Sequence, residues 1–150
     1  MKILMVCLGN ICRSPIAQGV LEKKIREKKL DWIVDSVGTS GWHDGEAPDD
    51  RAIKATKAVG IDISKQISRK ITPDDLDYFD VILTMDSSNY LDVINLCKTP
   101  LQKDKVSHML NFLRPGRNEA VPDPYYHDNF AEVVELLDDA MDAFILAKTS

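Results

Sequence analysis

The sequence has few cysteines and no long apolar run. Its 150 residues include three cysteines, an odd number that forms no disulfide framework and favours a reducing compartment. The apolar run at residues 3–6 is too short for a signal peptide, and no segment approaches the length of a membrane span. We therefore expect a cytoplasmic protein that has no membrane partner.

Positive charge is scarce as well. The 19 lysines and arginines against 24 acidic residues give a net charge of −5, which argues against a nucleic-acid-binding protein. The three histidines, His43, His108 and His127, show no metal-ligand spacing, so we expect no metal ion and no other cofactor. No linker, repeat or low-complexity tract divides the chain, and we expect one domain over residues 1–150.

Apolar strands alternate with helical segments along the chain. The predicted strands cover residues 2–6, 32–34, 79–84 and 106–110. The main predicted helices cover residues 15–29, 50–59, 87–96 and a stretch from about 128 onwards, and the segments 38–49 and 111–127 are predicted as loops. This order predicts a parallel sheet covered by helices on both faces, with ligands bound at the carboxyl ends of the strands.

The most informative segment follows the first predicted strand and reads CLGNICRS over residues 7–14. A loop between Cys7 and Arg13 can turn its backbone N–H groups inward around an anion, and the start of a helix adds partial positive charge. Arg13 offers a planar fork for two phosphate oxygens. We call this segment the cradle loop. Its predicted phosphate-binding residues are Leu8, Gly9, Asn10, Ile11, Cys12 and Arg13.

The cradle loop would also activate a nucleophile. The same N–H groups and helix start stabilise a thiolate on Cys7, which could then attack phosphorus. Ser14 is placed to donate a hydrogen bond to that thiolate, and Gly9 and Asn10 suit the positive φ angles of a tight loop. The C-x5-R spacing alone arises by chance in about one such chain in eight. The alternative is therefore a buried cysteine at a strand end, with Ser14 as a helix N-cap.

A second group is needed to protonate the leaving oxygen. The best candidate is Asp123, because the prolines on either side stiffen its backbone. Tyr125 and Tyr126 follow and would form the walls of a pocket for an aromatic substrate. A bound phosphate nearby favours the protonated carboxyl group, so we expect an acidic pH optimum. Taken alone, this segment is also consistent with a surface turn.

Together the two segments resemble the signature loops of the low-molecular-weight protein tyrosine phosphatases, and the resemblance covers essentially the whole chain. It implies a flavodoxin-like three-layer sandwich with a four-stranded parallel sheet and helices on both faces. It also implies that Cys7 is the nucleophile, Arg13 the phosphate clamp and Asp123 the general acid and base. Asn10 would lock the cradle loop through hydrogen bonds involving Ser36.

The resemblance further implies the substrate and the pocket. Phosphotyrosine in proteins or peptides, and aryl phosphates, would be hydrolysed through a phosphocysteine intermediate with inorganic phosphate as product. Trp42 matches the aromatic wall of the family's pocket, in the form typical of its bacterial branch, and would line a deep slot with Leu8 and Tyr125. The alternative is that Trp42 anchors its loop to the core. The resemblance also supports a redox role for Cys12, whose thiol would trap oxidised Cys7 as a disulfide.

Some positions depart from the pattern or leave alternatives open. Gln66 stands where the family often has a histidine that supports the loop asparagine, and we expect the network to survive. Asp86 either positions Arg13 or caps a helix. Arsenate reductases of similar fold need two further cysteines, and only Cys97 is available here. Phosphocysteine carriers of sugar transport require neither Arg13 nor Asp123, both of which are present here. The intact set of Cys7, Arg13 and Asp123 also gives no reason to prefer a module that only binds.

Overall fold

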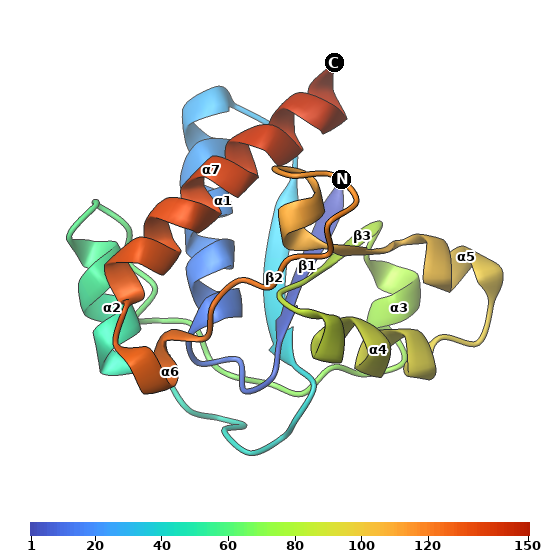
Figure 1. Cartoon of the computed structure of the whole chain (residues 1–150), viewed down its shortest axis with the longest axis horizontal. Helices are drawn as coiled ribbons and strands as arrows, with labels where there is room; N and C mark the ends of the chain where they lie inside the picture. Colours follow the sequence, from blue (N-terminus) through green and yellow to red (C-terminus); the bar gives the residue numbers. More distant parts are fainter.

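The computed structural model describes all 150 residues, in which strands and helices alternate (Figure 1). The strands are β1 (Lys2–Cys7), β2 (Ile33–Gly38), β3 (Val81–Thr84) and β4 (Val106–His108). The longer helices are α1 (Arg13–Lys28), α2 (Asp50–Lys57), α4 (Ser87–Leu96) and α7 (Phe130–Thr149). The short ones are α3 (Asp75–Tyr78), α5 (Pro100–Asp104), α6 (Pro124–His127) and the 3-10 turn Met109–Asn111.

The four strands form one parallel sheet in the order β2-β1-β3-β4. The central strand β1 pairs with β2 on one side and β3 on the other, and almost all of its residues are buried. A continuous apolar run is typical of a parallel strand covered on both faces. The predicted three-layer α/β fold is confirmed.

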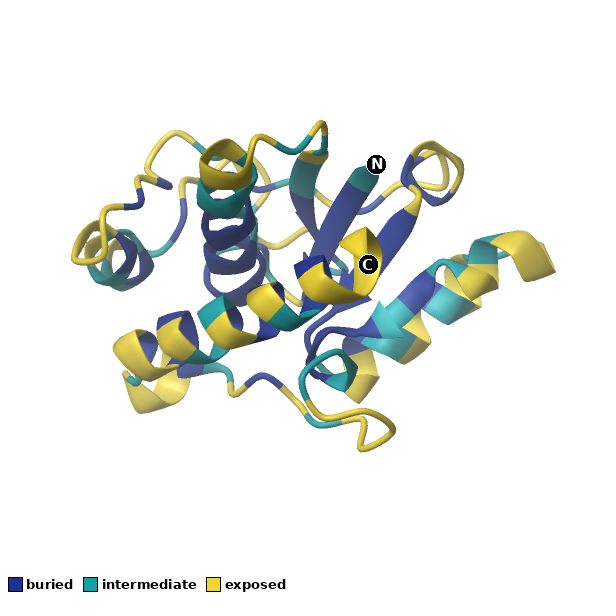
Figure 2. Cartoon of the chain, turned by 90° about the horizontal axis from the view of Figure 1, so that it is seen from above, coloured by how far each residue is buried: buried dark blue, intermediate teal, exposed yellow.

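Each face of the sheet has its own core because side chains alternate along a strand. Ile3 and Met5 of β1 belong to the larger core, which is packed under α1, α2 and α7. Leu4 and Val6 point the other way, into a smaller core that includes Val93 of α4. Figure 2 shows buried residues on the strands and on the inward faces of the helices.

Several predicted boundaries were wrong. Strand β2 continues to Gly38, past the predicted residues 32–34, because Val37 and Gly38 pair in register with the end of β1. Strand β3 begins at Val81, two residues later than predicted, and β4 ends at His108. Helix α1 begins at Arg13, two residues earlier than predicted.

Two short helices were not predicted at all. Helix α5 begins after Thr99, whose side chain accepts from the Gln102 N–H, and α6 begins after Asp123 inside a segment predicted as loop. Helices of four or five residues are too short to produce a recognisable hydrophobic period. No helix in the structure has both the length and the apolar character that crossing a membrane requires.

The loops that follow β1, β2 and β3 meet at the lower edge of the sheet in Figure 1, where α6 also lies. These are the carboxyl ends of the strands, where parallel α/β sheets bind their ligands. The fold therefore brings the cradle loop, the segment after Gly38 and the segment carrying Asp123 to one place.

Candidate active site

The cradle loop connects the end of β1 to the start of α1. Cys7 is the last residue of β1 and is only 3% exposed, while Arg13 is the first residue of α1. Within the loop, Asn10 has a positive φ of 56°, whereas Gly9 does not, so the expectation for Gly9 was wrong. A Cβ atom at Gly9 would lie 3.1 Å from Cδ2 of His43, a close contact that only a small movement of that side chain would relieve.

Two hydrogen-bonding groups face the Cys7 sulfur. The backbone N–H of Asn10 donates to Sγ at 3.3 Å, and the Ser14 hydroxyl lies 3.0 Å from it. Donors of this kind stabilise a thiolate relative to a thiol. Ser14 lies inside α1 and not at its N-cap, so the helix-cap alternative for this residue is wrong.

Asn10 connects the cradle loop to two other segments. Its side-chain N–H group donates to the hydroxyls of Ser14 at 2.8 Å and of Ser36 at 3.0 Å. Its carbonyl oxygen accepts from the backbone N–H of Arg69 at 3.1 Å. All of its side-chain polar atoms are therefore paired, and the left-handed backbone of this residue is held by β2 and by the segment before Ile71.

Gln66 has a different partner from the one expected. Its side-chain N–H group donates to the carbonyl of Pro15 at 3.1 Å, and its own oxygen is buried without a partner. It makes no hydrogen bond to Asn10, whose third partner is the Arg69 backbone. The hydrogen-bond network of the loop asparagine is complete without Gln66.

The Arg13 guanidinium is held from one side. It is 4% exposed, and Nη1 donates to Oδ2 of Asp86 at 2.8 Å and to the carbonyl of Val121 at 3.0 Å. Asp86 also accepts from the N–H of Asn89 at 2.8 Å as the N-cap of α4. It therefore both pairs with Arg13 and caps a helix, the two roles that the sequence left as alternatives. The other nitrogen, Nη2, lies 3.7 Å from Oδ2 of Asp123.

A small cavity of about 160 Å³ opens above the cradle loop. It is lined by Cys7, Leu8, Gly9, Ile11, Cys12, Arg13, Trp42, His43, Asp123, Tyr125 and Tyr126. The structure thus brings the predicted nucleophile, clamp, acid and pocket residues together around one space. Trp42 is 77% exposed and Tyr126 81% exposed, so both stand at the mouth, and Trp42 does not anchor its loop to the core.

His43 is a lining residue that the sequence analysis missed. Its ring packs against Gly9, and Nδ1 pairs with the carboxylate of Glu46. Its position next to Trp42 in the sequence was the available signal. No group of three or more His, Cys, Asp or Glu side chains is arranged to hold a metal ion.

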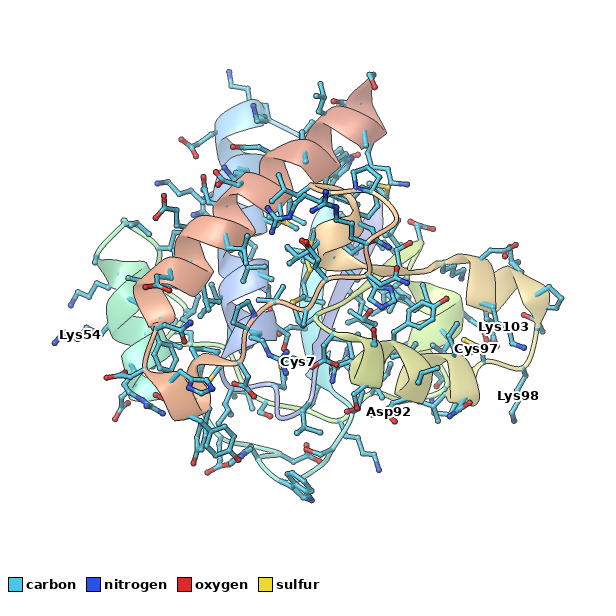
Figure 3. The ribbon with its side chains drawn as sticks, viewed as in Figure 1. Cys7, Lys54, Asp92, Cys97, Lys98 and Lys103 are labelled. Atoms are coloured by element: carbon cyan, nitrogen blue, oxygen red, sulfur yellow. The ribbon has the colours of Figure 1, made fainter.

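The three cysteines differ in their surroundings. Burial raises the pKa of the Cys12 thiol well above its usual range, and the charges of Asp49 and Cys7 add to the effect. Cys97 lies at the end of α4, remote from Cys7 (Figure 3), where its thiol donates to the carbonyl of Val93 at 3.3 Å. Burial raises the pKa of Cys97 as well. Among the three, Cys7 alone accepts a backbone N–H from the cradle loop and has a hydroxyl oxygen 3.0 Å from its sulfur.

The chain is similar to known proteins along almost its whole length. A family model described as low molecular weight phosphotyrosine protein phosphatase matches residues 2–149. The low molecular weight phosphotyrosine protein phosphatase of Schizosaccharomyces pombe is 39% identical over 143 residues, which cover 91% of this chain and 90% of that protein. Bacterial proteins are also among the relatives.

Solved structures agree with this match. A protein tyrosine phosphatase from Entamoeba histolytica with Hepes in its active site superposes with a TM-score of 0.92, at 38% identity and over 99% of this chain and 97% of that one. A Drosophila arginine phosphatase has a TM-score of 0.92 at 29% identity, covering 100% and 99% of the two chains. The chain therefore belongs to the low molecular weight phosphotyrosine protein phosphatase family, whose members are cysteine-based, metal-independent hydrolases.

Proposed function

We propose that this enzyme hydrolyses phosphotyrosine in proteins and peptides through a phosphocysteine intermediate on Cys7. The observation that carries the proposal is a single cavity with Cys7 and Arg13 in its lining and Asp123 3.7 Å from the arginine. A buried guanidinium, the start of α1 and the Asn10 N–H directed at the Cys7 sulfur favour an anion here, and the thiol and the carboxyl group supply two reactive groups.

The first step transfers the phosphoryl group to sulfur. The Cys7 thiolate attacks phosphorus, the S–P bond forms and the bond from phosphorus to the phenolic oxygen breaks. The carboxyl group of Asp123 gives its proton to that oxygen, so that a neutral phenol leaves. Arg13 and the cradle N–H groups hold the equatorial oxygens throughout, which is where the charge of the transition state is spread.

The second step returns the enzyme to its starting state. A water molecule attacks phosphorus and gives a proton to the Asp123 carboxylate, while the S–P bond breaks and inorganic phosphate is released. The departing thiolate receives a hydrogen bond from Ser14, whose oxygen lies 3.0 Å from the Cys7 sulfur. The carboxyl group is protonated again at the end, so the acid of the first step is the base of the second.

The walls of the cavity support an aromatic substrate. Leu8, Trp42, Tyr125 and Tyr126 surround the opening, and each has an exposed apolar or aromatic surface. A tyrosine side chain is long enough to place its phosphate on the cradle loop while its ring contacts these walls, and a serine side chain is shorter. The names of the relatives support a phosphotyrosine substrate, and the active site of the Entamoeba phosphatase holds Hepes, a molecule that carries a sulfonate group.

The proposed setting is the cytoplasm, because the mechanism requires a reduced Cys7. The proposed partners are phosphotyrosine proteins or peptides, and neither a nucleic acid nor a membrane takes part. The proposed redox role of Cys12 also belongs to this setting, since a disulfide with Cys7 would need a cellular thiol to reduce it.

The test is hydrolysis with a chelator present, using p-nitrophenyl phosphate and peptides that carry phosphotyrosine, phosphoserine or phosphoarginine. The wild type should turn over the first two substrates. Cys7→Ser should abolish turnover of both, and Asp123→Ala should lower turnover of the phosphotyrosine peptide, whose leaving oxygen is basic, by about 100-fold or more. Cys97→Ser is the matched cysteine control and should keep wild-type activity.

Other outcomes would assign the site differently. Faster turnover of the phosphoarginine peptide would place this chain with the Drosophila arginine phosphatase in substrate choice. An absence of turnover by the reduced wild type would contradict hydrolysis, and would favour a phosphoryl carrier or a binding protein.

A further inference from the structure

The segment that carries Asp123 has few attachments to the rest of the protein. Val121 is fixed, because its N–H donates to the Met85 carbonyl at 2.7 Å and its own carbonyl accepts from Arg13. Beyond it, no backbone hydrogen bond connects residues 122–128 to another part of the chain, and the Asp128 N–H returns to Pro124 inside the same segment. Beyond the covalent link to Val121, the position of Asp123 therefore depends on side-chain contacts, among them its own contact with Arg13.

Arg51 of α2 contacts this segment at both ends of α6. Its guanidinium carbon lies 5.4 Å from the ring centre of Tyr125 and 4.7 Å from that of Phe130, the first residue of α7. Its Nη1 lies 3.7 Å from Oδ1 of Asp128, the residue that ends α6 in a left-handed conformation. A planar guanidinium stacks on aromatic faces and pairs with a carboxylate at the same time.

The orientation of Arg51 is itself fixed by Asp49. Nε and Nη2 of Arg51 each donate to a different oxygen of the Asp49 carboxylate at 3.1 Å, in a two-point contact. The backbone N–H of Asp49 donates to the carbonyl of Ile11 in the cradle loop at 2.8 Å. One short path, from Ile11 through Asp49 and Arg51 to Tyr125, therefore connects the loop that holds the phosphate to the segment that holds the acid.

We propose that Arg51 is a positioning residue, which holds the segment 123–128 against the cradle loop so that the Asp123 carboxyl group reaches the leaving oxygen. This inference rests on the proposed function, in which Asp123 is the general acid. Arg51 is absent from the lining of the catalytic cavity, so it acts through Tyr125 and Asp128 and not on the substrate. Lysine, a point charge without a planar fork, would keep the pairing with Asp128 and lose the stacking.

The test uses aryl phosphates whose leaving phenols increase in basicity, and follows kcat/KM, which reports steps up to departure of the phenol. A basic phenolate needs the proton from Asp123, and an acidic one leaves without it. Arg51→Ala should lower kcat/KM on the order of tenfold with phenyl phosphate, and by less than about threefold with the most acidic phenol. Arg51→Lys should restore part of the loss.

Two further measurements separate this role from a general structural one. Arg51→Ala added to Asp123→Ala should cost no further activity with phenyl phosphate, since the group that Arg51 positions is already gone. The rate at which iodoacetamide alkylates Cys7 should stay at the wild-type value. Arg114→Ala, which removes another exposed arginine paired with a carboxylate, is the matched control and should behave as wild type throughout.

The two proposals fail in different ways. If Asp123→Ala keeps the wild-type dependence on leaving-group basicity, Asp123 is not the acid and the proposed mechanism is overturned. A steep dependence of kcat/KM on leaving-group basicity in Asp123→Ala would support Asp123 as the acid. The role of Arg51 would still be overturned if Arg51→Ala lost activity equally with every substrate, or if its loss added to that of Asp123→Ala.

Discussion

Gly38 and Leu8 approach so closely that a Cβ atom at Gly38 would lie 2.7 Å from the Leu8 carbonyl oxygen. Gly38 ends β2 and pairs with Cys7, so the backbone of the second strand passes directly beside the cradle loop. The atoms in the way belong to the backbone of Leu8 and Gly9, which no side-chain rotation can move.

Gly38→Ala should therefore displace the cradle loop. We expect kcat/KM to fall by roughly 10- to 100-fold, since small misplacements of catalytic groups are costly, and the free energy of unfolding to fall by about 1–3 kcal/mol. The measurements are phosphatase kinetics and urea unfolding. Gly41→Ala, where the nearest contact would be an ordinary 3.4 Å, is the control, and equal effects in both variants would contradict the prediction.

The two contacts of Asp86 can be separated by substitution. Asparagine keeps an N-cap acceptor for α4 but loses the charge that pairs with Arg13, whereas alanine loses both. Asp86→Asn should lower kcat/KM on the order of tenfold with little change in stability, and Asp86→Ala should also lose about 1 kcal/mol of unfolding free energy. Unchanged kinetics in Asp86→Asn would show that Arg13 needs no carboxylate partner.

His108 should make the stability of the fold depend on pH. Burial lowers its pKa below the usual value of about 6.5, although the Asp86 charge opposes this. Below that value the unfolded chain binds a proton that the folded chain does not, so stability is lost as the pH falls through the folded pKa. The Cm for urea should therefore drop between pH 7.5 and 5.5, and should drop less in His108→Gln. An equal drop in both proteins would exclude His108 as the cause.

Cys12 should protect the enzyme from peroxide. Hydrogen peroxide oxidises the Cys7 thiolate to a sulfenic acid, and the Cys12 thiol then displaces water to form a disulfide that a dithiol reduces. After peroxide treatment the wild type should recover activity with dithiothreitol, and Cys12→Ser should recover much less. Cys97→Ser, with its thiol remote from the site, should recover as the wild type does.

The cradle loop was predictable because its chemistry lies within consecutive residues. The strand before it, the residues from Cys7 to Arg13 and the helix after it are all visible in one stretch of sequence. Periodicity likewise indicated the parallel sheet and the long helices, since burial on one or both faces repeats at a fixed interval. The short helices α5 and α6 depend on a cap and a proline, and they were missed.

The structural contributions of Gly38, His43, Arg51 and Arg69 were not predictable in the same way. Each acts on the site through a contact with a residue far away in the chain, such as the backbone of Arg69 with Asn10 or the guanidinium of Arg51 with Tyr125. Nothing in the local pattern around them signals a distant partner. Gln66 is the opposite case. Its place in the sequence suggested a contact with Asn10, but in the structure its side chain donates to the carbonyl of Pro15.

The sequence by itself determined the type of chemistry, the family and the three-layer fold, because these depend on residue type, order and spacing along the chain. Only the tertiary structure decided that Asp123 lies 3.7 Å from Arg13, which nitrogen of Arg13 pairs with Asp86 and which residues line the opening. These depend on side chains that meet across separate segments, and their meeting is fixed by the packing of the sheet and helices as a whole.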